Sequence, residues 1–332
     1  MTVALSILDL APIAPGQTAR ESFAASVALA QTAEKHGYTR VWYAEHHNMP
    51  TIASSATSIL VGHVAAQTST IRLGAGGVML PNHSPLTIAE QFGTLAELYP
   101  GRIDLGLGRA PGSDQTTARA MRRDPRASDQ FPQDVLELQA YLRGESIIPG
   151  VQAVPGAGTN VPLYILGSSL FGAGLAAALG LPYAFASHFA PDALYEAVAT
   201  YRRDFKPSPQ LGQPLVIVGV NVIAADDAAD ATLQFETTRR ARVRGMISRG
   251  PAAPVYSDDQ IDAFLTTPEG RNIANMMRYS AVGTPPEVRA FLEEFAASTQ
   301  ADELIIAHQS RDIPARLRSV ELTADAMNGV MA

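Results

Sequence analysis

Strand-length runs of apolar residues alternate with helix-length segments along most of this chain. The first pair is a predicted strand at 3–8 and a helix at 21–36, which Gly37 ends. Further strands are predicted at 40–44, 71–79, 103–107, 163–166, 183–186, 215–224 and 303–307. Nearly continuous apolar runs are typical of parallel strands buried on both faces. About eight such pairs predict an α/β fold, a (β/α)8 TIM barrel, although strand counting alone leaves a doubly wound open sheet as a rival.

Two segments rich in turn-forming residues interrupt this alternation, at about 110–160 and 245–283. We expect both to be long insertions at the C-terminal face of the barrel, and candidate lids over a pocket. The whole chain, 1–332, is predicted to be a single domain. Further helices are predicted at 54–67, 85–98, 132–142, 171–179, 192–204, 228–242 and 285–298, and in the C-terminal tail.

The composition narrows the class of protein. Hydrophobic residues make up 46% of the 332 and charged residues 17%, which indicates a folded globular chain. The net charge of −7, without a run of Lys or Arg, argues against nucleic acid as a partner. There is no cysteine, so disulfides, thiolate metal sites and a cysteine nucleophile are excluded. We see no signal peptide and no apolar run long enough to span a membrane, and we expect a cytoplasmic location.

The second predicted strand ends in an unusual cluster of polar residues, Glu45, His46 and His47. Polar groups are costly to bury unless they are paired, and active sites lie at the C-terminal ends of barrel strands. Adjacent residues on an extended chain point to opposite faces, so the two histidines are not expected to bind one metal ion. His46 could act as an acid or base, or it could simply form hydrogen bonds with its surroundings.

Two other strand ends suggest an anion site. Gly167, Ser168 and Ser169 lie between a strand and a helix, where backbone N–H groups can bind phosphate; a serine N-cap explains them equally well. Arg109 directly follows the fourth strand and could pair with phosphate, or with a carboxylate such as that of Asp114.

Adjacent glycines, Gly76 and Gly77, interrupt the third predicted strand. They could let a flat ligand lie against the backbone. A bulge that bends the strand is the simpler interpretation, and the sequence alone favours it.

Taken together, these stretches resemble the bacterial luciferase-like flavin monooxygenases. They cover most of 1–190 in the order found in that family. The matching stretches are WYAEHH (42–47), IRLGAGGVMLPNHSP (71–85), AEQ (89–91), GRIDLGLGR (101–109), LGSS (166–169), LAA (175–177) and GLP (180–182), with looser matches at VGTP (282–285) and DELII (302–306).

The resemblance implies a (β/α)8 barrel that binds FMN, in its reduced form, at the C-terminal face. Gly76 and Gly77 would lie against the flavin ring. The catalytic histidine would be His46, with Glu45 and His83 as further active-site residues. The resemblance also implies a set of residues around the cofactor phosphate: Arg109, Gly167, Ser168, Ser169 and Gly172.

The luciferases carry a reactive cysteine where this chain has Gly108, so light emission is not implied. Our first hypothesis is an FMN-dependent monooxygenase that uses O2 and a small or lipophilic organic substrate, such as an aldehyde, with reduced FMN from a separate flavin reductase. The alternatives are a deazaflavin (F420)-dependent oxidoreductase, a non-catalytic flavin-binding protein and, more distantly, a metal-dependent hydrolase. The family also implies a homodimer, in which the helix at 85–98 could form the interface or pack on its own barrel.

Overall fold

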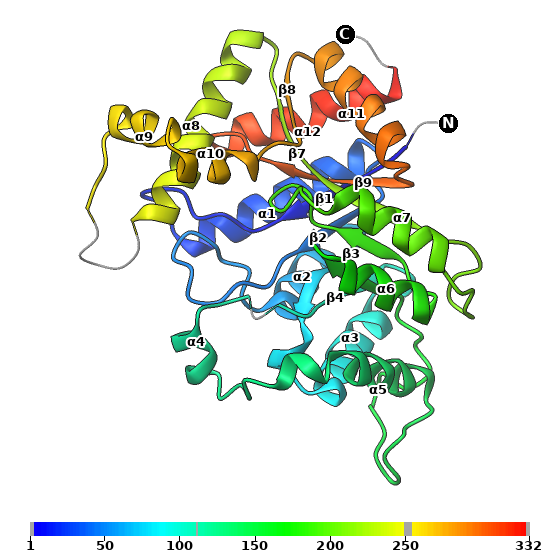
Figure 1. Ribbon diagram of the computed structural model, residues 1–332. Helices are drawn as coiled ribbons and strands as arrows, with labels where there is room; N and C mark the ends of the chain where they lie inside the picture. The colour runs from blue at the N-terminus through cyan, green and yellow to red at the C-terminus, as the bar shows by residue number, and fades with distance from the viewer. Residues whose placement is uncertain (1–2, 111, 249–253, 330–332) are drawn as a thin grey trace.

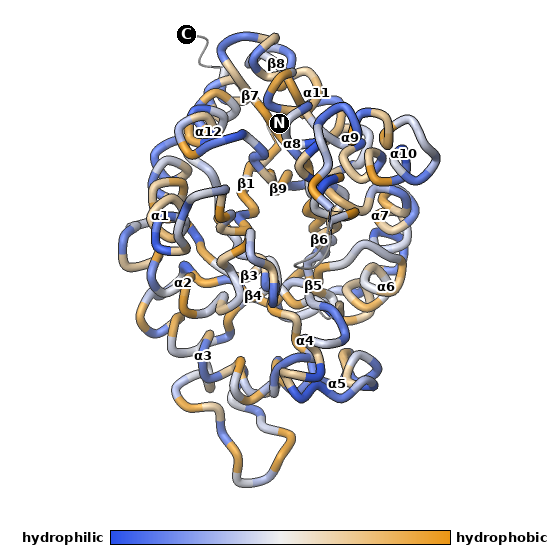
Figure 2. Tube along the Cα trace, turned by 90° about the vertical axis from the view of Figure 1, so that its left-hand side faces the viewer, coloured by the Kyte–Doolittle hydropathy of each residue, from blue (hydrophilic) through white to orange (hydrophobic). Residues whose placement is uncertain are grey.

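The computed structural model describes residues 3–110, 112–248 and 254–329. Within these residues, eight parallel strands form a closed ring in the order β1-β2-β3-β4-β5-β6-β7-β9 (Figures 1 and 2). The pairing of β6 with β7 closes the ring, and this excludes the doubly wound open sheet. The predicted TIM barrel is confirmed. Its strands are β1 (Ala4–Asp9), β2 (Arg40–Tyr43), β3 (Arg72–Met79), β4 (Ile103–Gly108), β5 (Leu163–Gly167), β6 (Tyr183–Phe185), β7 (Val216–Ala224) and β9 (Glu303–His308).

The helices form an outer layer around the strands, as the view along the barrel in Figure 2 shows. In the first unit, Thr18 and Glu21 form a capping box that begins α1, and Gly37 follows its end with a φ of +77°. The helices of the outer layer are α1 (Ala19–Lys35), α2 (Thr57–Ala65), α3 (Pro85–Leu98), α5 (Phe131–Arg143), α6 (Leu170–Leu179), α7 (Leu194–Asp204), α11 (Pro285–Thr299) and α12 (Ile313–Asn328).

Both predicted insertions are more structured than the sequence suggests. In the first, α5 packs against α3 as a regular helix of the barrel, so the true insertion is the segment before it, with the short helix α4 (Gln115–Ala120). The second contains α9 (Asp258–Leu265) and α10 (Pro268–Asn275), and the predicted helix before it, α8 (Ala228–Ile247), extends to its start. The helices α4, α9 and α10 lie on the same side of the molecule in Figure 1.

The second insertion also contains a strand that the sequence analysis missed. This strand, β8 (Ser280–Gly283), pairs with the C-terminal half of β7, beyond the part of β7 that pairs with β6. It therefore extends the sheet at the C-terminal rim of the barrel. Because it is only 4 residues long, it is hard to distinguish from the loop around it by hydrophobic pattern.

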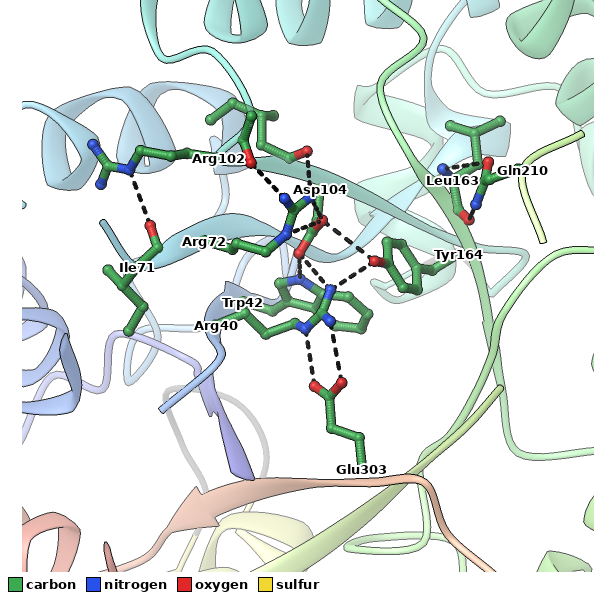
Figure 3. Close-up of polar contacts among 12 residues, drawn as sticks. Arg40, Trp42, Ile71, Arg72, Arg102, Asp104, Leu163, Tyr164, Gln210 and Glu303 are labelled. Atoms are coloured by element: carbon green, nitrogen blue, oxygen red, sulfur yellow. Dashed lines mark hydrogen bonds and ion pairs between the residues drawn. The ribbon is translucent and has the colours of Figure 1, made fainter. Parts of the chain in front are cut away.

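The N-terminal end of the barrel lumen is filled by a buried network of charges (Figure 3). The Arg40 guanidinium donates to Asp104 at 2.7 Å and to Glu303 at 3.1 Å. Asp104 also pairs with Arg72, and the hydroxyl of Tyr164 accepts from Arg40 at 2.7 Å. Above the network lies an apolar layer to which most strands contribute one side chain: Leu8, Trp42, Tyr164, Ala184, Ile217 and Ile305.

Candidate active site

Glu45 is the centre of a hydrogen-bond cluster at the C-terminal end of β2. Its carboxylate is 1% exposed and accepts from the Met79 backbone N–H at 3.0 Å. The same carboxylate accepts from Nε2 of His47 at 2.8 Å, from Nε2 of His83 at 3.0 Å and from the Asn82 amide at 3.1 Å. Burial acts to raise the pKa of Glu45, but these hydrogen bonds outweigh it and the net pKa is lowered. Glu45 is therefore an ionised acceptor that orients two imidazoles.

His46 takes no part in the hydrogen bonds of this cluster, although it lies between Glu45 and His47 in the chain. The residue is half-buried, and its Nδ1 atom is buried with no hydrogen-bond partner in the described part of the chain. Burial lowers the pKa of His46 despite the nearby charge of Glu45, so the imidazole is neutral near pH 7. A neutral imidazole with a free nitrogen can accept or donate a proton. The structure thus brings Glu45 and His83 into direct contact and leaves His46 unpaired.

The adjacent glycines of β3 form the predicted bulge. The register between β3 and β4 shifts between Ala75 and Val78, and the Gly76–Gly77 peptide bond is cis. A Cβ atom on Gly76 would lie 2.8 Å from the Cβ of Trp42, and one on Gly77 would lie 2.7 Å from a backbone carbonyl oxygen. Both positions therefore need glycine for packing alone, and their contact with a flavin stays a prediction.

Arg109 lies beside the first turn of α6. Its guanidinium carbon is 4.0 Å from the centre of the Phe171 ring, and the side chain has no ion pair among the residues that the structure describes. The alternative salt bridge to Asp114 does not form among the described residues; that carboxylate caps α4 by accepting from the Thr117 N–H at 2.7 Å. The arginine is exposed and free to bind an anion.

The residues predicted to surround a phosphate gather at the start of α6. Ser169 occupies the N-cap position, but its side chain makes no capping hydrogen bond, contrary to the serine-cap alternative. The Tyr183 hydroxyl fixes this turn by donating to the Ser169 carbonyl at 3.1 Å. Gly167 and Gly172 face each other, since a Cβ on Gly172 would lie 3.6 Å from the Cα of Gly167. Uncapped N–H groups at a helix start favour a bound anion.

Four polar residues near this face were not predicted as site residues. Asn82 and His188 each followed a predicted strand, so strand-end position could have identified them. Neither Asn221, inside a strand, nor Arg242, inside a helix, carried such a signal. Burial is the main cause that lowers the pKa of His188 to about 3, so this imidazole is neutral.

The described residues form neither a metal-binding cluster nor a membrane-spanning helix. In the part of the chain that the structure describes, no group of three or more His, Asp or Glu side chains could hold a metal ion. No helix among these residues is long and apolar enough to cross a membrane.

Comparison with known proteins identifies the class to which this fold and site belong. The sequence pattern of the family described as luciferase-like monooxygenase matches residues 3–303. A protein of Escherichia coli (strain K12) named luciferase-like monooxygenase is 51% identical over 326 residues, which is 98% of this chain and 97% of that protein. The chain belongs to the luciferase-like monooxygenases, a family of flavin-dependent enzymes.

More distant relatives carry more specific names. The N-acetyl-S-alkylcysteine monooxygenase of Bacillus subtilis (strain 168) is 32% identical, over 98% of each chain. The crystal structure of apo-MsnO8 has a TM-score of 0.87 at 38% identity, over 98% of each chain. Two structures at 16% identity share the fold alone. They are the oxygenating constituent of 3,6-diketocamphane monooxygenase in complex with FMN, with a TM-score of 0.73, and an F420-dependent secondary alcohol dehydrogenase, with a TM-score of 0.72.

Proposed function

We propose that this protein is an FMN-dependent monooxygenase that oxidises a small or lipophilic organic substrate with O2. The observation that carries the proposal is the unpaired Arg109 beside the uncapped start of α6. A guanidinium and a row of helix N–H groups together suit a phosphate, and riboflavin differs from FMN by that phosphate. A distant structure of the same fold contains FMN, which supports the choice of cofactor.

The residues at the C-terminal face fit this cofactor. Arg109, Ser168 and Ser169 would hold its phosphate, and Gly76 and Gly77 would lie beneath its ring. Reduced FMN, when bound, supplies the two electrons needed to place one oxygen atom of O2 in the substrate and release the other as water. We infer that a separate reductase supplies it, because the sequence shows no clear nicotinamide-binding motif.

The protein's own side chains would then control position and protons. His46 is neutral and its Nδ1 has no partner, so it can take up or give a proton at the substrate. His83 is fixed through the ionised carboxylate of Glu45. The half-buried setting of both histidines limits the access of water to the reaction.

The cofactor role of Arg109 is tested by comparing FMN with riboflavin. The Arg109→Ala variant should lose affinity for FMN by about tenfold or more, while riboflavin binding changes little, because only FMN carries the phosphate. Equal weakening of both would overturn the phosphate role. Arg126→Ala is the matched control, since this exposed arginine in the same insertion should affect neither ligand.

The reaction is tested by titrating the protein with reduced FMN without oxygen and then mixing it rapidly with oxygen. Bound flavin that reoxidises more slowly than free flavin would support the monooxygenase. The His46→Asn variant should bind flavin normally and form less oxygenated product; unchanged product formation would remove His46 from the mechanism. Tight flavin binding without an oxygen-dependent product from any substrate would instead favour a non-catalytic flavin-binding protein.

The main alternative for the cofactor is F420, because the same fold occurs in an F420-dependent dehydrogenase. Binding of reduced FMN and reduced F420 should be measured side by side on the same preparation. A clear preference for F420, with hydride transfer and no use of oxygen, would replace the proposal.

A homodimer is also proposed, on the family's precedent. The apolar face of α3 is buried within its own subunit through Ile88, Phe92 and Leu95. This agrees with the alternative that the helix at 85–98 packs on its own barrel. Large apolar side chains nevertheless remain exposed on both α2 and α3: Ile59 is 75% exposed and Leu98 63%. Sedimentation of the wild type and of an Ile59→Asp variant tests whether this surface joins two copies.

A cytoplasmic location remains our expectation from the sequence.

A further inference from the structure

The side chain of His188 lies inside the barrel lumen. Ile217 of β7 belongs to the apolar layer of the lumen, so Gly219, Asn221 and Ile223 face the same way. A Cβ atom on Gly219 would lie only 2.4 Å from Nδ1 of His188. The imidazole therefore occupies the lumen space that a larger residue at 219 would fill.

Around His188, two buried polar atoms have no hydrogen-bond partner among the residues that the structure describes. Nδ1 of His188 and Oδ1 of Asn221 are both buried without a hydrogen bond. The Asn221 amide nitrogen donates to the His188 carbonyl at 2.8 Å, which fixes the two residues against each other. A positive charge on His46 would lower the pKa of His188 further, so the two imidazoles lie within electrostatic range of each other. Buried polar atoms without partners are costly, and a ligand that binds them offsets that cost.

The helix α8 reaches over this end of the lumen. Its residues Ala231 and Phe235 pack on Ile223, which shares the lumen-facing side of β7. Arg242 lies eleven residues after Ala231, close to three full turns, so it is on the same face of the helix. The positive charge of Arg242 helps to lower the pKa of the buried His188, which agrees with a position on the face of α8 toward His188.

Arg242 differs from the other arginines of α8. Arg239 pairs with Glu236, Arg240 with Asp262 and Arg244 with Asp258. Arg242 is half-buried, yet it has no ion pair or hydrogen bond among the residues that the structure describes. Because partial burial weakens the hydration of a guanidinium, an anionic ligand would stabilise this one.

We propose that Arg242, together with His188 and Asn221, binds the carboxylate of the organic substrate, so that the enzyme acts on organic acids. That the bound acid is oxidised rests on the proposed function, whereas the binding of a carboxylate does not depend on it. The planar guanidinium matches the two oxygens of a carboxylate, and the neutral His188 leaves Arg242 as the cation of the subsite. The FMN phosphate is the less suitable ligand for Arg242. Arg109, the proposed phosphate ligand, lies at the end of β4, whereas His188 packs against β7. Two strands, β5 and β6, separate β4 from β7 in the barrel.

The test compares two probes of equal size, octanoate and its neutral amide octanamide, by calorimetric titration of the full-length protein. The wild type should bind octanoate about tenfold tighter than octanamide. Arg242→Gln should abolish that preference and leave octanamide binding unchanged, whereas Arg242→Lys should keep part of it. Arg244→Gln is the matched control, because it removes the same charge from the opposite face of α8.

Three outcomes would overturn the subsite: no binding of octanoate by the wild type, equal affinity for both probes, or a preference that survives Arg242→Gln. If Arg242→Gln instead weakens FMN more than riboflavin, Arg242 binds the cofactor phosphate and the proposal is wrong. A protein that prefers octanoate through Arg242 but does not bind reduced FMN would refute the proposed function and leave the subsite standing.

Discussion

The two ends of the barrel lumen differ in whether their buried polar groups have partners. At the N-terminal end, Arg40 and Arg72 face Asp104 and Glu303, and each of these charges has a partner of opposite sign. At the C-terminal end, the buried Nδ1 atoms of His46 and His188 and the guanidinium of Arg242 have no partner among the described residues. At one end every charge is paired within the network, and the other end leaves hydrogen-bonding capacity for a ligand.

This difference indicates that the N-terminal end of the lumen serves stability and the C-terminal end serves ligand binding. Burying a charge is costly unless it is paired, so the complete network at the N-terminal end can be kept without a ligand. The unpartnered groups at the other end lower stability unless something binds there. Substitutions in the N-terminal network should therefore lower the free energy of unfolding, and those of the unpartnered groups at the C-terminal end should mainly change binding.

The largest effect is expected at the N-terminal end, from Arg40→Met. The substitution leaves Asp104 and Glu303 buried without their shared partner, which should cost about 3–5 kcal/mol of unfolding free energy. Urea unfolding can be followed by the fluorescence of Trp42, the only tryptophan, whose indole N–H donates to Asp104 at 3.1 Å. As a control, Arg311→Gln breaks an exposed pair with Asp230 and should cost less than about 1 kcal/mol. Equal losses would contradict the claim that the buried network stabilises the fold.

The next effect concerns pH and the buried histidines. Burial lowers the pKa of His188 and of His308 from 6.5 to about 3. The unfolded chain therefore takes up protons below about pH 6.5 that the folded protein does not, so stability is full above that pH and falls as the pH drops toward 3. Each histidine should contribute a slope on the order of 1 kcal/mol per pH unit. The slope between pH 6.5 and 5 should be smaller in His188→Asn than in the wild type; an unchanged slope would mean that His188 titrates normally.

A smaller loss is expected from Gly76→Ala at the C-terminal end. The added methyl group would lie 2.8 Å from the Cβ of Trp42, so overpacking should cost about 1–3 kcal/mol and displace any flavin resting on this strand. Gly174→Ala is the control, because the space around that helical glycine is open and alanine favours helix by about 1 kcal/mol. Full stability and flavin binding in Gly76→Ala would show that the neighbouring strand adjusts easily.

The smallest effect is expected from Ser169→Ala, measured without cofactor. The Ser169 side chain makes no capping hydrogen bond, so its loss should leave unfolding unchanged within about 0.5 kcal/mol. Asp312 caps α12 by accepting from the Ala315 N–H at 2.8 Å, and Asp312→Ala should cost about 1 kcal/mol. A loss in Ser169→Ala as large as that in Asp312→Ala would show that Ser169 serves the helix rather than a ligand.

Much of the barrel could be predicted from the sequence, because its strands are long apolar runs with clear helices between them. The predicted strands at 103–107 and 215–224 lie close to β4 and β7. The short strand β8 could not be predicted, since four residues carry little pattern and its pairing with β7 is a long-range contact. The helix α4 was missed for a similar reason, because it buries no side chain.

The site was only partly predictable. Strand-end position identified Glu45, His46 and Arg109, because a residue that directly follows a parallel strand must lie at one face of the barrel. The choice between alternatives needed the structure: Asp114 turned out to cap a helix, and Arg109 was left unpaired. Arg242 lies among three other arginines on α8, and no local pattern separates it from them.

The sequence by itself determined the alternation of strands and helices, the absence of cysteine chemistry and the positions of polar residues at the strand ends, because these depend on local order along the chain. Tertiary structure alone decided the closure of the ring through β6 and β7, and which charges are paired. Pairing depends on contacts such as that between Arg40 and Glu303, which are 263 residues apart in the chain. Only the folded barrel brings such groups together, and only there can an arginine without a partner be recognised.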